Sequence, residues 1–220
     1  MKLKLFLAGL ICYCSSFAQP KNDAFIVVLG TAQDAGYPQM GCVKECCKRV
    51  ITHPEEKRMV VSLALVDPET QHWWLFEATP DIKEQLQLFQ KITNHQYSFL
   101  PDAVFITHAH IGHYTGLMYF GRESMNTKSL NVFEMPRMKN FLEMNGPWSQ
   151  LISLKNIELK DLREDSTVHL TNKISINSFI VPHRDEFSET VGFKIHFNQL
   201  NILFIPDIDK WNKFNKNITQ

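Results

Sequence analysis

Short apolar runs separated by turn-forming residues recur along this chain, and their lengths favour β-strands. Residues 24–29 form a continuous apolar run closed by Gly30, which predicts a buried first strand. Residues 58–66 and 72–76 are β-branched or aromatic runs, and the Asp-Pro-Glu-Thr sequence between them predicts a hairpin. Comparable runs predict further strands at 103–107, 130–133, 168–170, 174–181, 190–197 and 202–205.

Segments whose apolar residues have helical spacing lie between these runs. Ile82, Leu86 and Phe89 recur at helical spacing and predict one buried helix face. The Pro80 before them favours the first turn of that helix. Further helices are expected at 114–123 and 137–144. Strands in both halves with helices between them predict an α+β domain, in which two sheets pack face to face with helices outside.

The N-terminus has the pattern of a secretory signal peptide. Two lysines precede an apolar stretch at 5–14, and Ser16-Phe17-Ala18 provides a small-x-small cleavage site. We expect cleavage there, so that residues 1–18 are the signal peptide and residues 19–220 form the mature domain. The apolar stretch is shorter than the ~20 residues that span a bilayer. We therefore expect a periplasmic or secreted protein without a stable membrane anchor.

The composition and charge of the chain limit the kinds of molecule that it is expected to bind. The chain has 220 residues, of which 44% are hydrophobic, as expected for one globular domain. Lysines plus arginines and aspartates plus glutamates number 23 each, so the chain has no net charge that would attract nucleic acid. We expect a small-molecule substrate and no nucleic-acid partner, while the composition does not indicate an oligomeric state.

Histidines with metal-ligand spacing follow one of the predicted strands. His108, His110 and His113 lie within six residues, where a tight loop after a rigid strand can aim imidazoles at one point. His183 and Asp207 each follow another apolar run, and loops at strand ends converge on a common site. Because neutral imidazole and carboxylate are zinc ligands, the pattern predicts a metal site.

This pattern resembles the metallo-β-lactamase superfamily, whose signature is His-x-His-x-Asp-His followed by a distant His and a distant Asp. The resemblance spans most of the mature chain and implies an αββα sandwich. It implies two metal sites, with His108, His110 and His183 in the first, Asp207 as the bridge and His113 in the second. More narrowly, residues 28–39 and the cysteines after them resemble the opening of the pyrroloquinoline-quinone (PQQ) biosynthesis protein B family.

The sequence departs from the superfamily pattern at two points. Gly112 stands where the signature has Asp, which removes a ligand of the second metal site. Asp209 or Asp185 is a candidate replacement, although aspartates at strand ends also simply favour turns. The chain also stops at Gln220, before the region where the superfamily usually supplies its last histidine. We therefore expect a chain that is truncated at its C-terminus.

Hydrolysis is the chemistry that such a site favours. Three neutral imidazoles leave the charge of a metal ion largely intact, so that a bound water is acidified toward neutral pH. We expect a hydrolase with one or two Zn²⁺ ions, in which Asp207 and His113 act as catalytic residues. The same ligands suit Fe²⁺, and the resemblance then implies a non-haem iron oxygenase related to PQQ biosynthesis. The third hypothesis is an exported, metal-stabilised binding protein without turnover, which Gly112 favours.

Three cysteines, Cys42, Cys46 and Cys47, lie in a segment without helical or strand period, residues 31–54. We expect this segment to be irregular and to be held by one of two links. The resemblance implies a structural zinc, for which His53 is a further candidate ligand. Adjacent Cys46 and Cys47 do not easily bind one ion together, so a disulfide from Cys42 to one of them is the alternative in an oxidising compartment.

Overall fold

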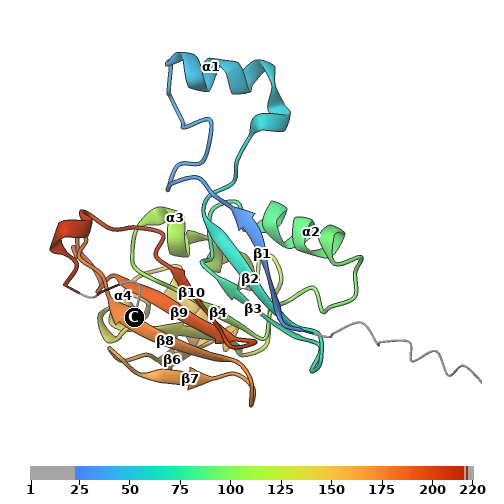
Figure 1. Ribbon diagram of the computed structural model, residues 1–220, viewed down its shortest axis with the longest axis vertical. Coiled ribbons are helices and arrows are strands. Elements are labelled where there is room, and N and C mark those ends of the chain that lie inside the picture. The colour runs from blue at the N-terminus through green and yellow to red at the C-terminus, as the bar shows by residue number, and fades with distance from the viewer. Residues whose placement is uncertain (1–22, 216, 218–220) are drawn as a thin grey trace, which may run out of the picture.

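The computed structural model describes residues 23–215 and 217 and shows two β-sheets that face each other, with helices on the outer side of one of them (Figure 1). The predicted α+β class is therefore confirmed. The predicted signal peptide, residues 1–18, lies outside the described residues. Among the residues that the structure describes, no helix is both long enough and apolar enough to cross a bilayer.

The larger sheet has six strands that follow the chain order. They are β1 (Phe25–Gly30), β2 (Ser62–Asp67), β3 (His72–Phe76), β4 (Ala103–Phe105), β5 (Leu130–Glu134) and β6 (Ile157–Asp161). β2 and β3 pair antiparallel, which confirms the predicted hairpin, whereas β3 to β6 are parallel. Because parallel neighbours run in one direction, β3, β4 and β5 all end at the same edge of the sheet.

The smaller sheet is antiparallel, in the order β10-β9-β8-β7. Its strands are β7 (Thr167–His169), β8 (Ser175–Ile180), β9 (Val191–Phe197) and β10 (Leu200–Phe204). The backbone N–H of Val191 donates a hydrogen bond of 3.1 Å to the carbonyl of Thr107, just after β4. This bond joins the start of β9 to the end of β4, so the two sheets meet where the histidine motif begins.

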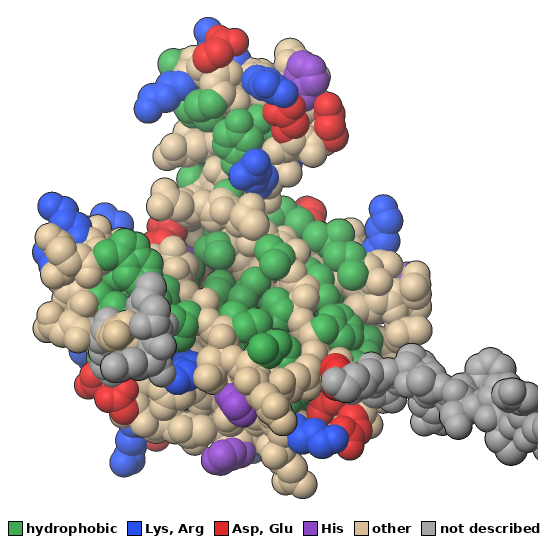
Figure 2. Space-filling model, in the orientation of Figure 1, with side chains coloured by type: hydrophobic (Ala, Val, Ile, Leu, Met, Phe, Trp, Pro, Cys, Tyr) green, Lys and Arg blue, Asp and Glu red, His purple; other side chains and the backbone are tan. Residues whose placement is uncertain are grey.

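Five α-helices are described, along with three short 3₁₀ helices. The α-helices are α1 (Glu45–Thr52), α2 (Ile82–Ile92), α3 (Ile111–Tyr114), α4 (Pro136–Met144) and α5 (Trp148–Ser153), and the 3₁₀ helices span Pro54–Glu56, Thr115–Phe120 and Trp211–Lys213. Buried residues of α2, α4 and α5 pack on the outer face of the larger sheet. In contrast, α1 stands clear of both sheets on an arm formed by residues 31–58, and charged side chains of both signs surround it (Figures 1 and 2).

Several elements differ from the sequence prediction, and α5 was not predicted at all. The segment 31–54 was expected to be irregular, yet it contains α1, because Cys47 and Val50 are spaced three residues apart and make one buried helix side. The helix expected at 114–123 is instead the short α3 followed by a 3₁₀ helix. β6 had no strong apolar signal, because Glu158 and Asp161 on this edge strand are exposed.

Both faces of the larger sheet are buried. On the outer face, Trp73 stacks on Phe89 of α2 with ring centroids 3.9 Å apart. On the inner face, Phe105 packs between the sheets, with its ring centroid 5.1 Å from Phe76 and 5.7 Å from Phe193. Because β4 is buried on both faces, the short strand that precedes the histidine motif is rigid.

Replacing Phe105 with Ala should lower the free energy of unfolding by about 3–5 kcal/mol, because the cavity left between the two sheets lies among rings that cannot fully close it. Urea denaturation followed by circular dichroism measures this change. Phe99→Ala is the control, since that ring is 42% exposed and its loss should cost much less. Equal losses for the two variants would contradict a core centred on β4.

Candidate metal centre

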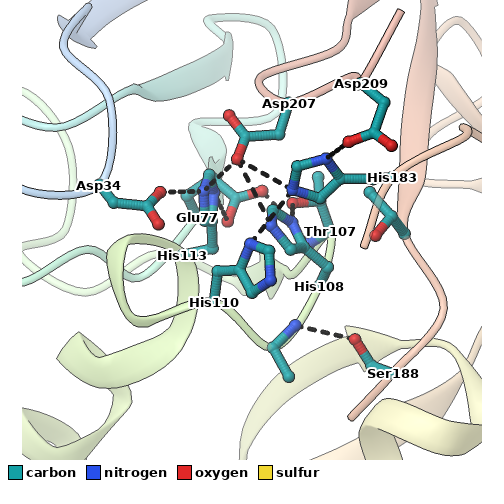
Figure 3. A network of polar contacts seen from close by, with 12 residues as sticks. Asp34, Glu77, Thr107, His108, His110, His113, His183, Ser188, Asp207 and Asp209 are labelled. Carbon is teal, nitrogen blue, oxygen red and sulfur yellow. Dashed lines mark hydrogen bonds and ion pairs between the residues drawn. The ribbon is translucent and has the colours of Figure 1, made fainter. Parts of the chain in front are cut away.

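The predicted metal ligands come from three separate loops that meet beside the end of β4 (Figure 3). His108 and His110 lie in the loop after β4, and His113 lies in α3. His183 follows β8, and Asp207 follows β10. The structure therefore brings together side chains that are up to 99 positions apart in the sequence, from His108 to Asp207.

Four side chains, His108, His110, His183 and Asp207, present ligand atoms within 4.8 Å of one another. The Nε2 of His183 lies 3.1 Å from Nδ1 of His110 and 3.4 Å from Oδ2 of Asp207, which itself lies 3.6 Å from Nε2 of His108. Zinc bonds of ~2.0–2.1 Å in a tetrahedron place neighbouring ligand atoms about 3.4 Å apart. The separations of these ligand atoms thus fit binding to one metal ion.

His108 is the most deeply buried of these four residues. Its side chain is 1% exposed, and its Nε2 has no hydrogen-bond partner among the described residues. Burial, together with the neighbouring imidazoles, lowers the pKa of His108 to about 2. The ring is therefore neutral, and its Nε2 lone pair points into the group of ligand atoms. An unpaired buried nitrogen costs free energy unless something at the centre satisfies it.

The outer nitrogen of each imidazole has an oxygen partner. Glu186 lies 3.1 Å from Nε2 of His110, and Asp209 lies 3.2 Å from Nδ1 of His183. The hydroxyl of Thr107 lies 2.9 Å from Nδ1 of His108. When each outer nitrogen donates its hydrogen to that oxygen, the inner nitrogen keeps a lone pair for a metal ion. Metal-binding histidines in proteins are generally oriented in this way.

His113 forms a second group with Asp34 and Asp207. Its Nε2 lies 2.9 Å from Oδ1 of Asp34 and 3.6 Å from Oδ2 of Asp207. Burial alone lowers the pKa of His113, but the surrounding carboxylates outweigh it and raise this pKa well above its usual range. The pKa of Asp34 is lowered, chiefly by its hydrogen bond from His113. Asp34 was not among the candidates drawn from the sequence.

Glu77 is a further residue that the sequence analysis missed. It follows β3 directly, is completely buried, and accepts hydrogen bonds from Nδ1 of His113 at 3.1 Å and from the backbone N–H of Thr107 at 3.2 Å. Burial raises the pKa of Glu77, and these two donors oppose that rise. A carboxylate directly after a buried strand, at the edge where the histidine strand also ends, was the available signal.

Asp185 and Asp209, the candidates for the missing carboxylate of the motif, have other partners. Asp185 accepts a hydrogen bond of 2.8 Å from the hydroxyl of Thr190, and Asp209 contacts the outer nitrogen of His183. Neither belongs to a ligand group within the described chain. The second group takes its carboxylate from Asp34, which approaches from the loop after β1 (Figure 3).

The arm carries a separate group of possible ligands. The sulfur atoms of Cys42, Cys46 and Cys47 lie within 4.8 Å of one another, and all three are free thiols in the structure. Helix α1 places the two adjacent cysteines beside Cys42, so the three can meet at one point. His53 is not part of this group, and its Nδ1 lies 3.1 Å from the carbonyl of Arg49. Structural zinc and a disulfide from Cys42 both stay predictions for this group.

A cavity of about 1070 Å³ separates the arm from the histidines. Its walls include Asp34, Tyr37, Cys46, Arg58, His183 and Asp207. Both ligand groups therefore border this cavity through at least one residue.

The oxygen atoms that contact the outer imidazole nitrogens lead to a prediction for zinc affinity. Asp209→Asn should weaken Zn²⁺ binding by about 10–100-fold, because the outer nitrogen of His183 then loses the carboxylate that holds its tautomer. Competition with a chromophoric chelator measures the affinity. Asp185→Asn is the matched control, since its carboxylate accepts a hydrogen bond from Thr190 and touches no predicted ligand. Equal affinities of the two variants would contradict this role of Asp209.

Comparisons with known proteins agree with this fold. Residues 72–218 match the family described as Beta-lactamase superfamily domain. Coenzyme PQQ synthesis protein B of Methylorubrum populi is 31% identical over 199 residues, which cover 82% of this chain and 64% of the relative. The same protein of Methylococcus capsulatus is 31% identical over 132 residues, which cover 58% of this chain and 42% of the relative. The chain thus spans less than two thirds of these relatives.

Solved structures share the fold. Zn(2+)-bound PqqB from Methylobacterium extorquens superposes with a TM-score of 0.68 at 22% identity, covering 85% of this chain and 67% of that one. A diphosphatase from the PhnP family superposes with a TM-score of 0.56 at 21% identity, covering 78% of this chain and 61% of that one. The family match over residues 72–218 and this shared fold show that the chain belongs to the metallo-β-lactamase superfamily and is similar to PQQ biosynthesis protein B.

Proposed function

We propose that this protein is a metal-dependent hydrolase, similar to PQQ biosynthesis protein B, that acts on a small molecule in the cavity beside the histidines. The observation that carries this proposal is the group formed by His108, His110, His183 and Asp207, whose ligand atoms all lie within 4.8 Å of one another. The cavity borders this group at His183 and Asp207, so a substrate has access to it. No nucleic-acid partner is proposed.

Zn²⁺ is the ion that we assign to this group. Three imidazoles and one carboxylate are a zinc ligand set, and the related PqqB of Methylobacterium extorquens is described as Zn(2+)-bound. When bound, such an ion lowers the pKa of a coordinated water and polarises a carbonyl or phosphoryl oxygen. Fe²⁺ also accepts these ligands, so elemental analysis of the purified protein is part of the test below.

Asp207 is placed to take part in proton transfer. Burial raises its pKa, but the hydrogen bond and charge of His113 outweigh burial and keep the pKa below its usual value. The carboxylate is therefore ionised at neutral pH, and it borders the cavity. From there it can accept a proton from an attacking water or hold that water toward a substrate. His113, oriented by Glu77, holds Asp207 from the other side.

His110→Ala should lose the bound ion and hydrolytic turnover together, because it removes one corner of the ligand group. Elemental analysis measures the ion, and cleavage of a phosphodiester, a diphosphate and a β-lactam probe measures turnover. The matched control is His169→Ala, an exposed histidine of β7 outside both ligand groups. A His110→Ala protein with unchanged metal content would sink the assignment of this site.

The same experiment separates the other two hypotheses. Bound iron with oxygen consumption in the wild-type protein would replace the hydrolase by the oxygenase hypothesis. A wild-type protein that holds metal, hydrolyses no probe and consumes no oxygen would favour a metal-stabilised binding protein.

We also propose that the protein is exported to the periplasm or secreted. The support is the N-terminal pattern of two lysines, an apolar stretch and the Ser16-Phe17-Ala18 sequence. Mass spectrometry of protein recovered outside the cytoplasm of its own host should then find Gln19 as the first residue. A protein that retains Met1 and stays in the cytoplasmic fraction would contradict export.

A further inference from the structure

Asp34 lies where the superfamily signature would put the side chain of residue 112. A Cβ built on Gly112 would lie 2.6 Å from Cα of Asp34 and 2.8 Å from its Oδ1, both of which are too close for real atoms. A side chain at position 112 and Asp34 in its present place therefore exclude each other. The glycine in the motif leaves open the space that Asp34 fills from a different part of the chain (Figure 3).

The loop that carries Asp34 is tied to the body of the protein on both sides of this residue. Before it, the backbone N–H of Val61 donates to the carbonyl of Ala32 at 2.8 Å. After it, Tyr37 and Arg58 exchange two backbone hydrogen bonds of 3.0 Å. The position of the Asp34 carboxylate is thus set by the fold and not only by its contact with His113. Preorganised ligands of this kind favour metal binding.

The charges around His113 favour a bound cation. Three carboxylates, those of Asp34, Glu77 and Asp207, surround this one completely buried imidazole. Glu77 contacts Nδ1, which leaves Nε2 facing the oxygens of the other two at 2.9 Å and 3.6 Å. One imidazole nitrogen and two carboxylate oxygens within 4.8 Å of one another are ligands that a divalent ion such as Zn²⁺ accepts. An ion among Nε2 and the two facing oxygens would also offset the negative charge of the carboxylates.

We infer that Asp34 is a ligand of a second divalent cation, together with His113 and Asp207, and that it replaces the aspartate that the superfamily signature carries at the position of Gly112. This inference rests on the proposed function, because Asp207 belongs to both ligand groups and would bridge the two ions. It assigns the second site to a residue outside the histidine motif. It also makes the loop after β1, and with it the arm, part of the metal centre.

The experiment counts bound zinc in the full-length protein. Chelator-treated protein is titrated with Zn²⁺ against a chromophoric chelator, for the wild type, Asp34→Asn, Gly112→Ala and the control Glu45→Gln. Asparagine keeps the size of the side chain but removes its charge. Glu45 is an exposed carboxylate on the same arm outside both ligand groups. Because all four proteins keep the three cysteines, zinc bound by the thiols cancels in the comparison.

The wild type and Glu45→Gln should bind one more equivalent of zinc than Asp34→Asn, or bind that equivalent more than about tenfold more tightly. Gly112→Ala should weaken the same equivalent, because its methyl group displaces Asp34 although residue 112 contributes no ligand. Equal zinc binding by the wild type and Asp34→Asn, even with a lower free energy of unfolding for the variant, would overturn the inference and leave Asp34 as a structural ion-pair partner.

This outcome is distinct from a failure of the proposed function. Asp34→Asn leaves His108, His110 and His183 intact, so the first equivalent of zinc should persist in it. Loss of that first equivalent is measured with His110→Ala. A protein in which His110→Ala loses zinc while Asp34→Asn matches the wild type keeps the proposed function and refutes only the second site.

Discussion

The contact on which the centre depends is the pair of hydrogen bonds that Glu77 accepts after β3. One bond comes from the buried ring of His113 and the other from the backbone of Thr107, directly before the first histidine of the motif. A single carboxylate therefore fixes both ends of the histidine loop. Burying this carboxylate is costly, and the two donors offset that cost. The rest of the centre is built outward from this fixed loop.

The parallel part of the larger sheet makes that contact possible. β3 and β4 are neighbours and run in the same direction, so the residues after Phe76 and Phe105 leave the sheet side by side. An antiparallel pair would have placed Glu77 and Thr107 at opposite edges. The packing of Phe105 between the two sheets holds this register, and the bond from Val191 to Thr107 adds the smaller sheet. Core packing and site geometry are thus linked through β4.

Much of this arrangement could be predicted from the sequence, because strands buried on both faces leave continuous apolar runs and their ends mark where loops converge. The convergence of His108, His110, His183 and Asp207 was predicted from that rule together with the spacing of the histidine motif and its resemblance to the superfamily signature. The rule did not predict α1 and β6, because a short helix on an arm and a polar edge strand bury little apolar surface. Glu77 and Asp34 escaped it too, because a carboxylate beside a loop looks the same in sequence whether it faces solvent or a buried imidazole.

The positions of Gly112 and Asp34 show why the spacing of the motif alone does not predict the ligands of this centre. In the sequence, Gly112 means that the motif lacks one ligand. In the folded protein, the missing side chain of Gly112 leaves room for the loop after β1. The carboxylate of Asp34 on this loop contacts the neighbouring His113. What the site requires is negative charge beside Nε2 of His113, and the fold can supply it from either segment. A glycine within a ligand motif therefore indicates a lost metal site only where no other segment places a ligand in the space left by its missing side chain.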